Sequence, residues 1–358
     1  MLALLAAATL SSTQLGAWGV ETLDLIRRDF YLPEKLLYAE ETGSKEPCFN
    51  WGTGVMLSAL NAAAKLDSKY LPWLEEYASA SRIYWNDKGP VPGYDVLPAP
   101  KPVDRYYDDN EWMALQLIEA YELTKSEKYL TWARETVDYV LSGEDQKLGG
   151  GIYWRESDKK SKNTCSNGPG VAACTALYRH TKDSRLLVSA IRIYGWTKKR
   201  LQDPQDHLFW DSVNLSGKVD KMKWSYNTAL MIRSAADLYS LTGNPQYKKD
   251  LVQMQSASAK KWLRGAIKDE GRFAHLLLDA WIFQRTHVPY PGQERADERA
   301  FVAPLTFLHD IARSPTGFYG SRFYQPSAVT QSKWALIDQA SVARAYFSAA
   351  LYLRAHSN

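Results

Sequence analysis

The sequence predicts a single all-α domain over residues 1–358, an (α/α)6 barrel made of six helical hairpins. Three observations predict this fold. The chain contains an internal repeat of about sixty residues, each repeat pairs two different kinds of helix, and long loops interrupt the helical pattern. No linker or low-complexity stretch divides the chain. We therefore expect one barrel domain with short β-hairpin insertions.

The repeat is a turn between two helices. Residues 121–129 (YELTKSEKY), 178–186 (YRHTKDSRL) and 239–247 (YSLTGNPQY) share its layout, and residues 64–70 are a weaker copy. Each copy starts where one apolar-periodic segment ends and finishes where the next begins. Asp, Ser or Asn supplies the turn and N-cap chemistry between them.

The two helices of a repeat differ in composition. Residues 129–141 are amphipathic, whereas residues 171–177 are small and apolar. This contrast predicts outer and inner helices, and a closed ring of six hairpins explains both the spacing and the contrast. An open solenoid is the alternative, but atypical capping repeats are not evident.

The loops between hairpins carry their own signals. Residues 149–155 (GGGIYWR) combine a glycine turn with a short aromatic run, and residues 207–224 are typical of a β-hairpin. Loops of this length in a compact domain are usually functional.

Composition excludes several functions. Aromatic residues make up 13% of the chain, with 13 Trp and 22 Tyr, which suits stacking on sugar rings as well as filling a large core. The net charge of +4 is spread without a basic stripe, so no nucleic-acid partner is expected. Cys165 and Cys174 fall too far apart on one helix to form a disulfide. The six His residues show no metal-ligand spacing.

The start of the chain is open to two interpretations. Residues 2–10 form an apolar run without a preceding basic residue, so residues 1–16 are either the remnant of an export signal or the start of the first helix. No later segment has the roughly 18 apolar residues of a membrane span. A monomer is favoured.

Two adjacent carboxylates are the sharpest local feature. Asp108 and Asp109 open a helix within residues 105–114 (RYYDDNEWMA). Glycoside hydrolysis needs two carboxyl groups, and consecutive side chains at a helix start diverge by about 100°. The helix N-terminus favours the anionic form of one, while mutual repulsion keeps the proton on the other. The alternative is a capping box between Asp108 and Glu111.

Other motifs also open expected inner helices, so in a closed ring they converge at one end. The candidate substrate-binding residues from these motifs and their loops are Trp51, Tyr94, Asp95, Tyr107, Trp154, Asn163, Asn167, Trp224, Tyr226 and Asn227. For the asparagines, turn formation and capping are the alternative role. Gln339 and Arg344 lie on the last helix, where core or surface roles are favoured.

Four of these motifs together resemble glycoside hydrolase family 76. They are residues 107–114 (YDDNEWMA), 149–154 (GGGIYW), 162–168 (KNTCSNG) and 224–227 (WSYN). The resemblance implies an (α/α)6 barrel with endo-acting, retaining α-1,6-mannanase activity on mannan. It also implies that Asp108 is the nucleophile and Asp109 the general acid/base, and that no metal or other cofactor is used. Because mannan is an extracellular polymer, the resemblance further implies a secreted, periplasmic or cell-surface location. Fungal members are thought to be transglycosylases. Because this sequence shows neither a membrane-anchor tail nor a GPI-type C-terminus, a bacterial-type hydrolase is favoured.

Two other functions remain open from sequence. A sugar epimerase on the same barrel would use inward-facing histidines, for which His180 and His309 are the candidates. A non-catalytic glycan-binding protein on the same fold is the other, and the intact aspartate pair argues against it.

Overall fold

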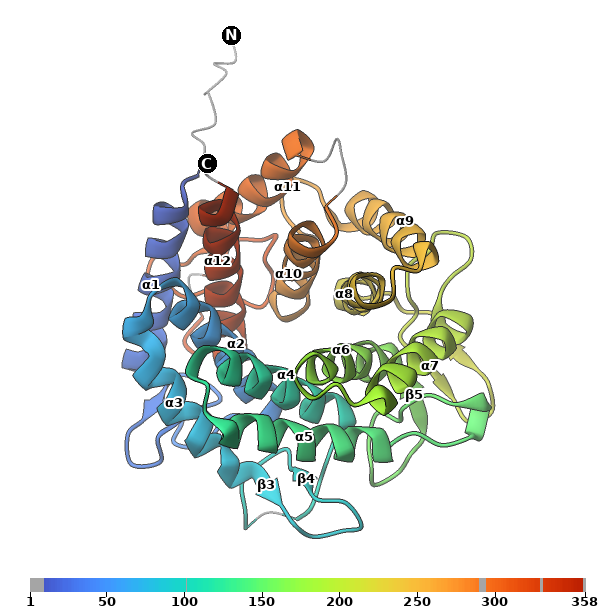
Figure 1. Cartoon of the computed structure of the whole chain (residues 1–358). Helices are drawn as coiled ribbons and strands as arrows, with labels where there is room; N and C mark the ends of the chain where they lie inside the picture. The colour runs from blue at the N-terminus through green and yellow to red at the C-terminus, as the bar shows by residue number, and fades with distance from the viewer. Residues whose placement is uncertain (1–9, 101, 290–293, 329–330, 357–358) are drawn as a thin grey trace.

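The computed structural model describes residues 10–100, 102–289, 294–328 and 331–356, and is a ring of helices in two layers (Figure 1). The inner layer consists of α2 (Asn50–Leu66), α4 (Tyr107–Thr124), α6 (Thr164–Thr181), α8 (Ser225–Thr242), α10 (Gly271–His287) and α12 (Leu336–His356). Each inner helix packs against the next, and α12 returns to contact α2. The ring is therefore closed, as the (α/α)6 prediction requires, and the open solenoid is ruled out.

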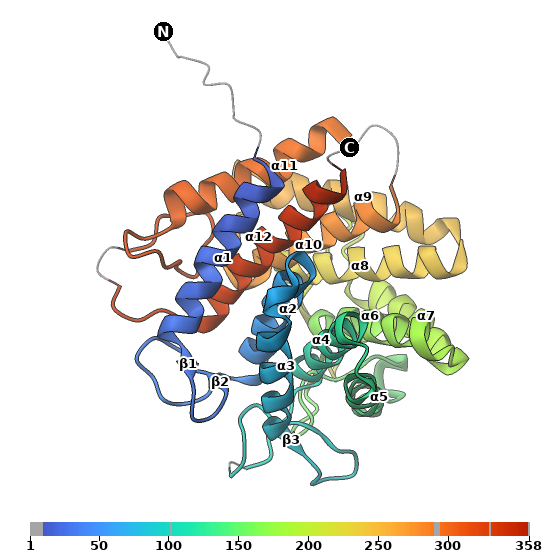
Figure 2. The same ribbon diagram turned by 60° about the vertical axis from the view of Figure 1, so that its left-hand side comes forward.

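The outer layer surrounds this ring (Figures 1 and 2). It consists of α1 (Ser12–Asp29), α3 (Leu71–Ala80), α5 (Glu127–Ser142), α7 (Ser184–Leu201), α9 (Pro245–Trp262) and α11 (Glu294–Phe307). Short 3-10 segments η1 (Ser68–Tyr70), η2 (Ser81–Tyr84) and η3 (Lys147–Gly149) and the π-helical turn η4 (Leu308–Ala312) adjoin these helices. Of the ambiguous residues 1–16, those from Ser12 onward belong to α1, and residues 1–9 lie outside the described part.

The sixty-residue repeat corresponds to the turn that ends each inner helix. Lys125, Lys182 and Gly243 adopt the left-handed conformation after α4, α6 and α8. Their backbone N–H groups donate to the carbonyl oxygens of the repeated tyrosines, Tyr121, Tyr178 and Tyr239, at 2.8–2.9 Å. This is the αL helix ending, which satisfies a carbonyl left unpaired at the helix end. The repeat seen in the sequence is thus a repeated helix stop.

Small residues allow the inner helices to pack closely. Nearly all of α6 is buried, because it has neighbours on both sides and an outer helix behind it. A side chain on Gly168 would place a Cβ atom 2.7 Å from the Cβ of Leu230 on α8, so only glycine fits. Outer helices such as α5 instead bury one face, with Ala133, Val137 and Val140 turned inward.

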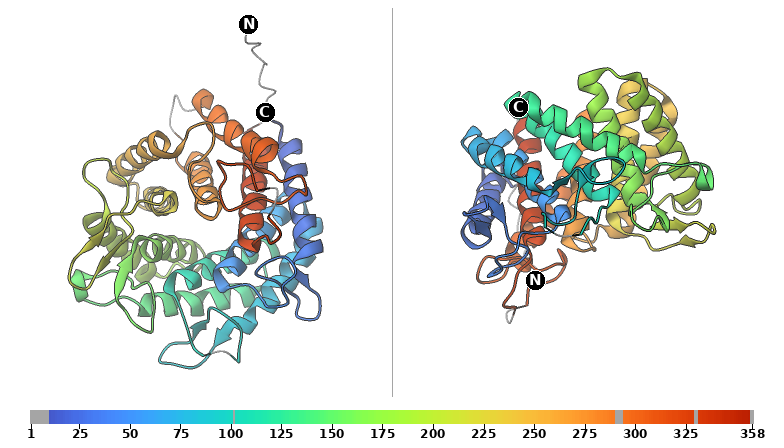
Figure 3. Two further views of the ribbon diagram at one scale, coloured as in Figure 1. Left: turned by 180° about the vertical axis from the view of Figure 1, so that it is seen from behind. Right: turned by 90° about the horizontal axis from the view of Figure 1, so that it is seen from below.

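Long loops precede the inner helices and contain the short strands of the described structure. β1 (Tyr31–Leu32) and β2 (Leu37–Tyr38) precede α2, and β3 (Trp85–Asn86) and β4 (Gly93–Tyr94) precede α4. β5 (Ser161–Asn163) precedes α6 and pairs with β6 (Ser212–Asn214), which pairs with β7 (Val219–Asp220) before α8. The expected hairpin within residues 207–224 is confirmed as β6–β7. The loops gather at one end of the barrel (Figure 3), where the inner helices begin.

Cys48, Cys165 and Cys174 are all buried as free thiols, and the last two lie on α6. No described helix combines the length and hydropathy of a transmembrane span.

Candidate active site

The first turn of α4 carries the aspartate pair at the loop-bearing end of the barrel. Asp108 and Asp109 are the second and third residues of the helix, and both side chains are partly exposed. The N-cap residue is Tyr106, and it makes no side-chain capping hydrogen bond. Glu111 is fully buried, and neither of its carboxyl oxygens hydrogen-bonds to the described residues. The capping box between Asp108 and Glu111 is therefore wrong, and the pair is free for another role.

Asp108 receives donors from three directions. The backbone N–H of Asp109 donates to its Oδ1 at 3.1 Å, and the indole Nε1 of Trp154 donates to its Oδ2 at 3.0 Å. The Cys165 thiol, at the start of α6, hydrogen-bonds to the same carboxylate, and the Tyr226 hydroxyl on α8 hydrogen-bonds to that thiol. Three inner helices and one loop thus meet at Asp108.

The loop that presents Trp154 is held at both ends. The N–H of Tyr107 donates to the carbonyl of Trp154 at 2.9 Å, and the N–H of Trp154 donates to the carbonyl of Ser161 at 3.1 Å. Gly151 has a φ of +82°, and a Cβ atom there would lie 2.6 Å from the ring of Trp196, so the turn requires glycine. The indole of Trp154 is consequently fixed over the aspartate pair while its ring stays 40% exposed.

A buried lysine anchors the glycine turn. The Nζ of Lys162 donates to Asp145 Oδ1 and to the carbonyl of Gly150, both at 2.7 Å, and to the carbonyl of Lys147 at 2.9 Å. Burial lowers the pKa of Lys162, but three acceptors compensate the buried ammonium. Lys162 therefore supports the site from within the protein.

Aromatic side chains from three inner helices or their starts form a wall at the same end. Phe273 on α10 stacks on Tyr226 with ring centroids 4.4 Å apart, and lies 5.9 Å from Trp51 and 5.3 Å from Trp224. All four residues are partly exposed. Their arrangement provides flat apolar surface next to the hydroxyl–thiol–carboxylate chain that ends at Asp108.

A third carboxylate joins two of the expected asparagines. Asn163 and Asn227 donate through Nδ2 to the two oxygens of Asp211, at 3.5 and 3.3 Å. Asp211 is partly exposed on the loop before β6, and burial raises its pKa. The Oδ1 of Asn227 makes no hydrogen bond to the described part of the chain. Asn227 is fully buried, so the expectation that it contacts substrate is corrected, and Asn163 is only 7% exposed. Both asparagines hold the Asp211 carboxylate at the site.

Four expected substrate-binding residues lie in the framework instead. Tyr94 and Tyr107 are each 1% exposed, Tyr94 accepting from Arg82 and Tyr107 stacking on Tyr139 at 5.0 Å. Asp95 is 3% exposed and accepts from Asn86 at 2.5 Å. Asn167 is fully buried, and both ends of its amide bind backbone. The prediction that these four contact substrate is corrected: they shape the loops behind the site.

Asn167 is one of three side-chain amides that each pair with both backbone groups of a single loop residue. Its Oδ1 accepts the N–H of Ile152 at 2.8 Å, and its Nδ2 donates to the carbonyl of the same residue at 2.9 Å. Asn110 on α4 binds both backbone groups of Tyr94 in this way, at 2.7 and 2.9 Å. Gln339 on α12 does so with Tyr319, at 2.9 Å for both bonds. Each amide fastens the long loop to the helix that follows, and Gln339 thereby has the core role expected of it.

The histidines of the epimerase alternative lie elsewhere. His180, near the end of α6, pairs with Glu122 at 2.9 Å, and His309 on η4 stacks on Trp18 with centroids 3.9 Å apart. The contacts of these two histidines do not include Asp108 or Asp109. Within the described residues no three His, Cys, Asp or Glu side chains are grouped so as to hold a metal ion.

Comparison with known proteins identifies the family. The model of glycosyl hydrolase family 76 matches residues 29–285, which is well over half of the chain and contains every motif described above. This chain belongs to glycosyl hydrolase family 76.

Solved family 76 structures share the barrel. An α-mannanase of Bacteroides thetaiotaomicron is 31% identical, with a TM-score of 0.90 over 96% of this chain and 97% of that one. An α-1,6-mannanase of Salegentibacter sp. is 21% identical, with a TM-score of 0.82 over 94% and 99%. Its structure is that of an inactive variant with two neighbouring aspartates changed to asparagine, in complex with α-1,6-mannotriose. The family and (α/α)6 predictions are confirmed.

Curated relatives match over shorter segments. The mannan endo-1,6-α-mannosidase of Candida glabrata is 30% identical over 114 residues, which cover 29% of this chain and 26% of the relative. The same enzyme of Saccharomyces cerevisiae is 27% identical over 128 residues, covering 33% and 28%. The matching segment thus spans less than a third of each of these relatives.

The environment of this family 76 chain separates the two aspartates electrostatically. Burial raises the pKa of Asp108 to about 6, and its three hydrogen-bond donors oppose a larger rise. Burial also raises the pKa of Asp109 well above its usual range, and the charges of Asp108 and Asp104 raise it further. The first carboxyl therefore ionises at a lower pH than the second.

Three contributors were not predicted from sequence. They are Phe273, which completes the aromatic wall, Asp211, which joins the asparagine pair, and Lys162, whose motif gives no sign of its buried anchoring role. A signal exists for Asp211, because it lies in a long aromatic loop before an inner helix. Phe273 sits in an ordinary amphipathic pattern, and nothing in the sequence distinguishes it.

Proposed function

We propose that this chain is a retaining endo-α-1,6-mannanase in which Asp108 is the nucleophile and Asp109 the general acid/base. The observation that carries the assignment is the asymmetry of the pair. Asp108 holds three donors and loses its proton first, whereas Asp109 keeps its proton. A nucleophile must be ionised and an acid must carry a proton, so the asymmetry fits this division of labour.

The first half of the reaction forms a glycosyl-enzyme. An oxygen of Asp108 attacks the anomeric carbon of the mannosyl unit, while the glycosidic C–O bond breaks and Asp109 delivers its proton to the leaving oxygen. In the second half the ionised Asp109 takes a proton from water, whose oxygen attacks the anomeric carbon and releases Asp108. Two displacements retain the anomeric configuration.

The aromatic wall fits the chemistry of the substrate. Phe273, Tyr226, Trp51 and Trp224 offer flat faces to the C–H surfaces of mannosyl rings, and Trp154 lies beside the reacting pair. Asp211, held by Asn163 and Asn227, supplies a partly exposed carboxylate for hydroxyls. The mannanases among the relatives, one of them solved with α-1,6-mannotriose, support the same substrate class. Because mannan is an extracellular polymer, we place the enzyme outside the cytoplasm.

Product analysis with debranched α-1,6-mannan tests this proposal. Wild type and the Asp108→Asn variant are incubated side by side, and the products are separated by thin-layer chromatography and mass spectrometry. A ladder of mannooligosaccharides from wild type alone is expected, with α-anomers appearing first by NMR. Mannose alone would contradict endo action, β-anomers first would contradict retention, and no release from any α-linked mannan would refute the proposed substrate.

A further inference from the structure

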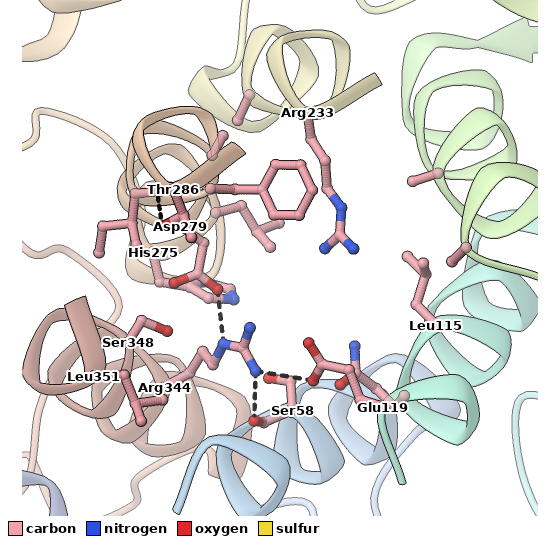
Figure 4. Close-up of a pocket in the computed structure, with 18 of the residues that line it drawn as sticks. Ser58, Leu115, Glu119, Arg233, His275, Asp279, Thr286, Arg344, Ser348 and Leu351 are labelled. Atoms are coloured by element: carbon pink, nitrogen blue, oxygen red, sulfur yellow. Dashed lines mark hydrogen bonds and ion pairs between the residues drawn. The ribbon is translucent and has the colours of Figure 1, made fainter. Parts of the chain in front are cut away.

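A second cavity lies inside the barrel, toward the ends of the inner helices that are opposite the aspartate pair. Its volume is about 560 Å³, within the range of about 300–1,000 Å³ typical of small-molecule sites. Glu119 on its wall follows Asp108 by eleven residues on α4, which is about 16 Å along the helix axis. Trp112, one turn after Asp108, lines the near side of the cavity. Figure 4 shows the cavity with side chains from several inner helices around it.

A partly buried arginine forms the polar floor of this cavity (Figure 4). Arg344 on α12 donates through Nε to Asp279 on α10 at 2.7 Å. Its Nη1 donates to Glu119 on α4 at 3.2 Å and to the backbone carbonyl of Ser58 on α2 at 2.9 Å. The guanidinium therefore joins four inner helices and holds the carboxylates in fixed positions.

Several polar atoms of the lining retain unused hydrogen-bonding capacity. The Oδ1 of Asp279 is buried and makes no hydrogen bond to the described residues, and neither does the Nη2 of Arg344. Arg233 extends into the cavity from α8 (Figure 4) with only a 3.8 Å contact to Asp237 and its guanidinium over the Phe283 ring, 4.7 Å from the centroid. A buried polar group without a partner is costly, so these atoms suit a ligand that offers both donors and acceptors.

The charges of the lining favour a neutral ligand. Five cationic side chains (Lys65, Arg179, Arg233, Arg344, Arg354) lie among four anionic ones (Glu119, Glu122, Asp237, Asp279), so the lining is nearly balanced. The walls between them are apolar, with Leu115, Leu230, Leu276, Phe283 and Leu351. A phosphate or a polyamine would leave one sign of charge unmatched. A sugar instead pairs adjacent hydroxyls with a carboxylate and a guanidinium while its C–H face packs on the apolar walls.

We propose that this cavity is a second carbohydrate site that binds a neutral mono- or disaccharide between Arg233 and the Arg344–Asp279 pair. The site is separate from the aspartate pair, and its assignment does not depend on the activity proposed above.

Fluorine NMR of protein labelled with 5-fluorotryptophan separates the two sites, because Trp112 lines the cavity and Trp154 lies at the aspartate pair. The resonances are assigned with Trp112→Phe and Trp154→Phe, and the protein is titrated with mannose, α-1,6-mannobiose and mannose 6-phosphate. We expect saturable shifts of the Trp112 signal with the neutral sugars. Arg233→Met should weaken this binding at least tenfold and leave the titration of Trp154 and kcat/KM on mannan within about twofold. Asp237 retains its ion pair with Arg179, at 2.7 Å, so this variant leaves no carboxylate without a cationic partner.

Two further variants complete the test. Ala176→Phe fills the cavity from a partly exposed position on α6 and should abolish the response of Trp112. Arg185→Met, on the outer helix α7, is the matched control and should change nothing. The proposal is overturned if no neutral sugar moves the Trp112 signal, or if Arg233→Met and Ala176→Phe titrate like wild type. Tighter binding of mannose 6-phosphate than of mannose would overturn the neutral ligand class.

Discussion

Replacing Trp154 with phenylalanine isolates one of the bonds that set the ionisation of Asp108. The substitution keeps an aromatic ring against Tyr106, whose centroid lies 5.0 Å away, and removes the Nε1–H that donates to Asp108 at 3.0 Å. A hydrogen bond to a charged group contributes about 1.5–3 kcal/mol. The Trp154 side chain is 40% exposed, so water replaces part of this contribution. One pKa unit corresponds to about 1.4 kcal/mol, so a contribution at the lower limit of this range shifts the pKa by about one unit.

The expected result is an upward shift of the acidic limb of the pH profile. Asp108 must be ionised to attack, so raising its pKa from about 6 to about 7 moves the limb of kcat/KM by about one unit. Activity should fall about tenfold at pH 5 and hardly at all at pH 8. Trp85→Phe is the matched control, because its Nε1 donates to Asp87 at 2.7 Å away from the pair. An unchanged or downward-shifted acidic limb in Trp154→Phe would refute the reasoning.

Four further results are expected. Asp109→Asn should lower kcat about 10²–10⁴-fold and Asp108→Asn at least as much, and near-wild-type turnover in either would remove that residue from the mechanism. The pKa of Asp108 is raised in the folded state, so its contribution to the free energy of unfolding is complete below the unfolded pKa near 4 and declines as pH rises toward 6. The Asp108→Asn variant should therefore have a higher melting temperature than wild type at pH 8 but not at pH 4. Equal differences in melting temperature at the two pH values would contradict this. Phe273→Ala should raise KM on mannan about three- to tenfold with little change in kcat, which initial-rate measurements decide. Asn167→Ala leaves both backbone groups of Ile152 without a hydrogen-bond partner. It should therefore lower the free energy of unfolding, measured by denaturant titration, by about 2–5 kcal/mol. A loss below about 1 kcal/mol would show that water replaces the amide.

The barrel could be predicted because its repeat depends on interactions between residues that are close in sequence. The turns after Tyr121, Tyr178 and Tyr239 end a helix by the same backbone bond each time, so the spacing of the stops reports the number of hairpins. Two of the three helices that follow these stops begin with an ordinary cap: Asp183 accepts from the N–H of Arg185 and Asn244 from that of Gln246, both at 3.0 Å. Such signals depend on residues a few positions apart, and a single sequence contains them in full.

The site was predictable to the level of the motif but not of the side chain. The motifs 107–114 and 162–168 do meet, yet Asn167 and Tyr107 serve the framework while Trp154, from the loop between them, stays 40% exposed beside Asp108. An asparagine at the start of a helix looks the same whether its amide holds a loop or a ligand. The choice depends on which backbone groups the preceding loop leaves unpaired, and that is a property of the folded loop.

The two aspartates owe their different roles to contacts from outside their helix. Both lie in the first turn of α4, so the helix N-terminus acts on them almost equally. Only Asp108 meets Trp154 and Cys165, and only Asp109 is raised further by Asp104. The position of Trp154 depends in turn on the glycine turn that Lys162 holds by three bonds. The loop of the next hairpin therefore sets the difference in protonation between these two adjacent, identical residues. A substitution at Lys162 would change the activity by changing the pKa of Asp108, without any contact between Lys162 and substrate.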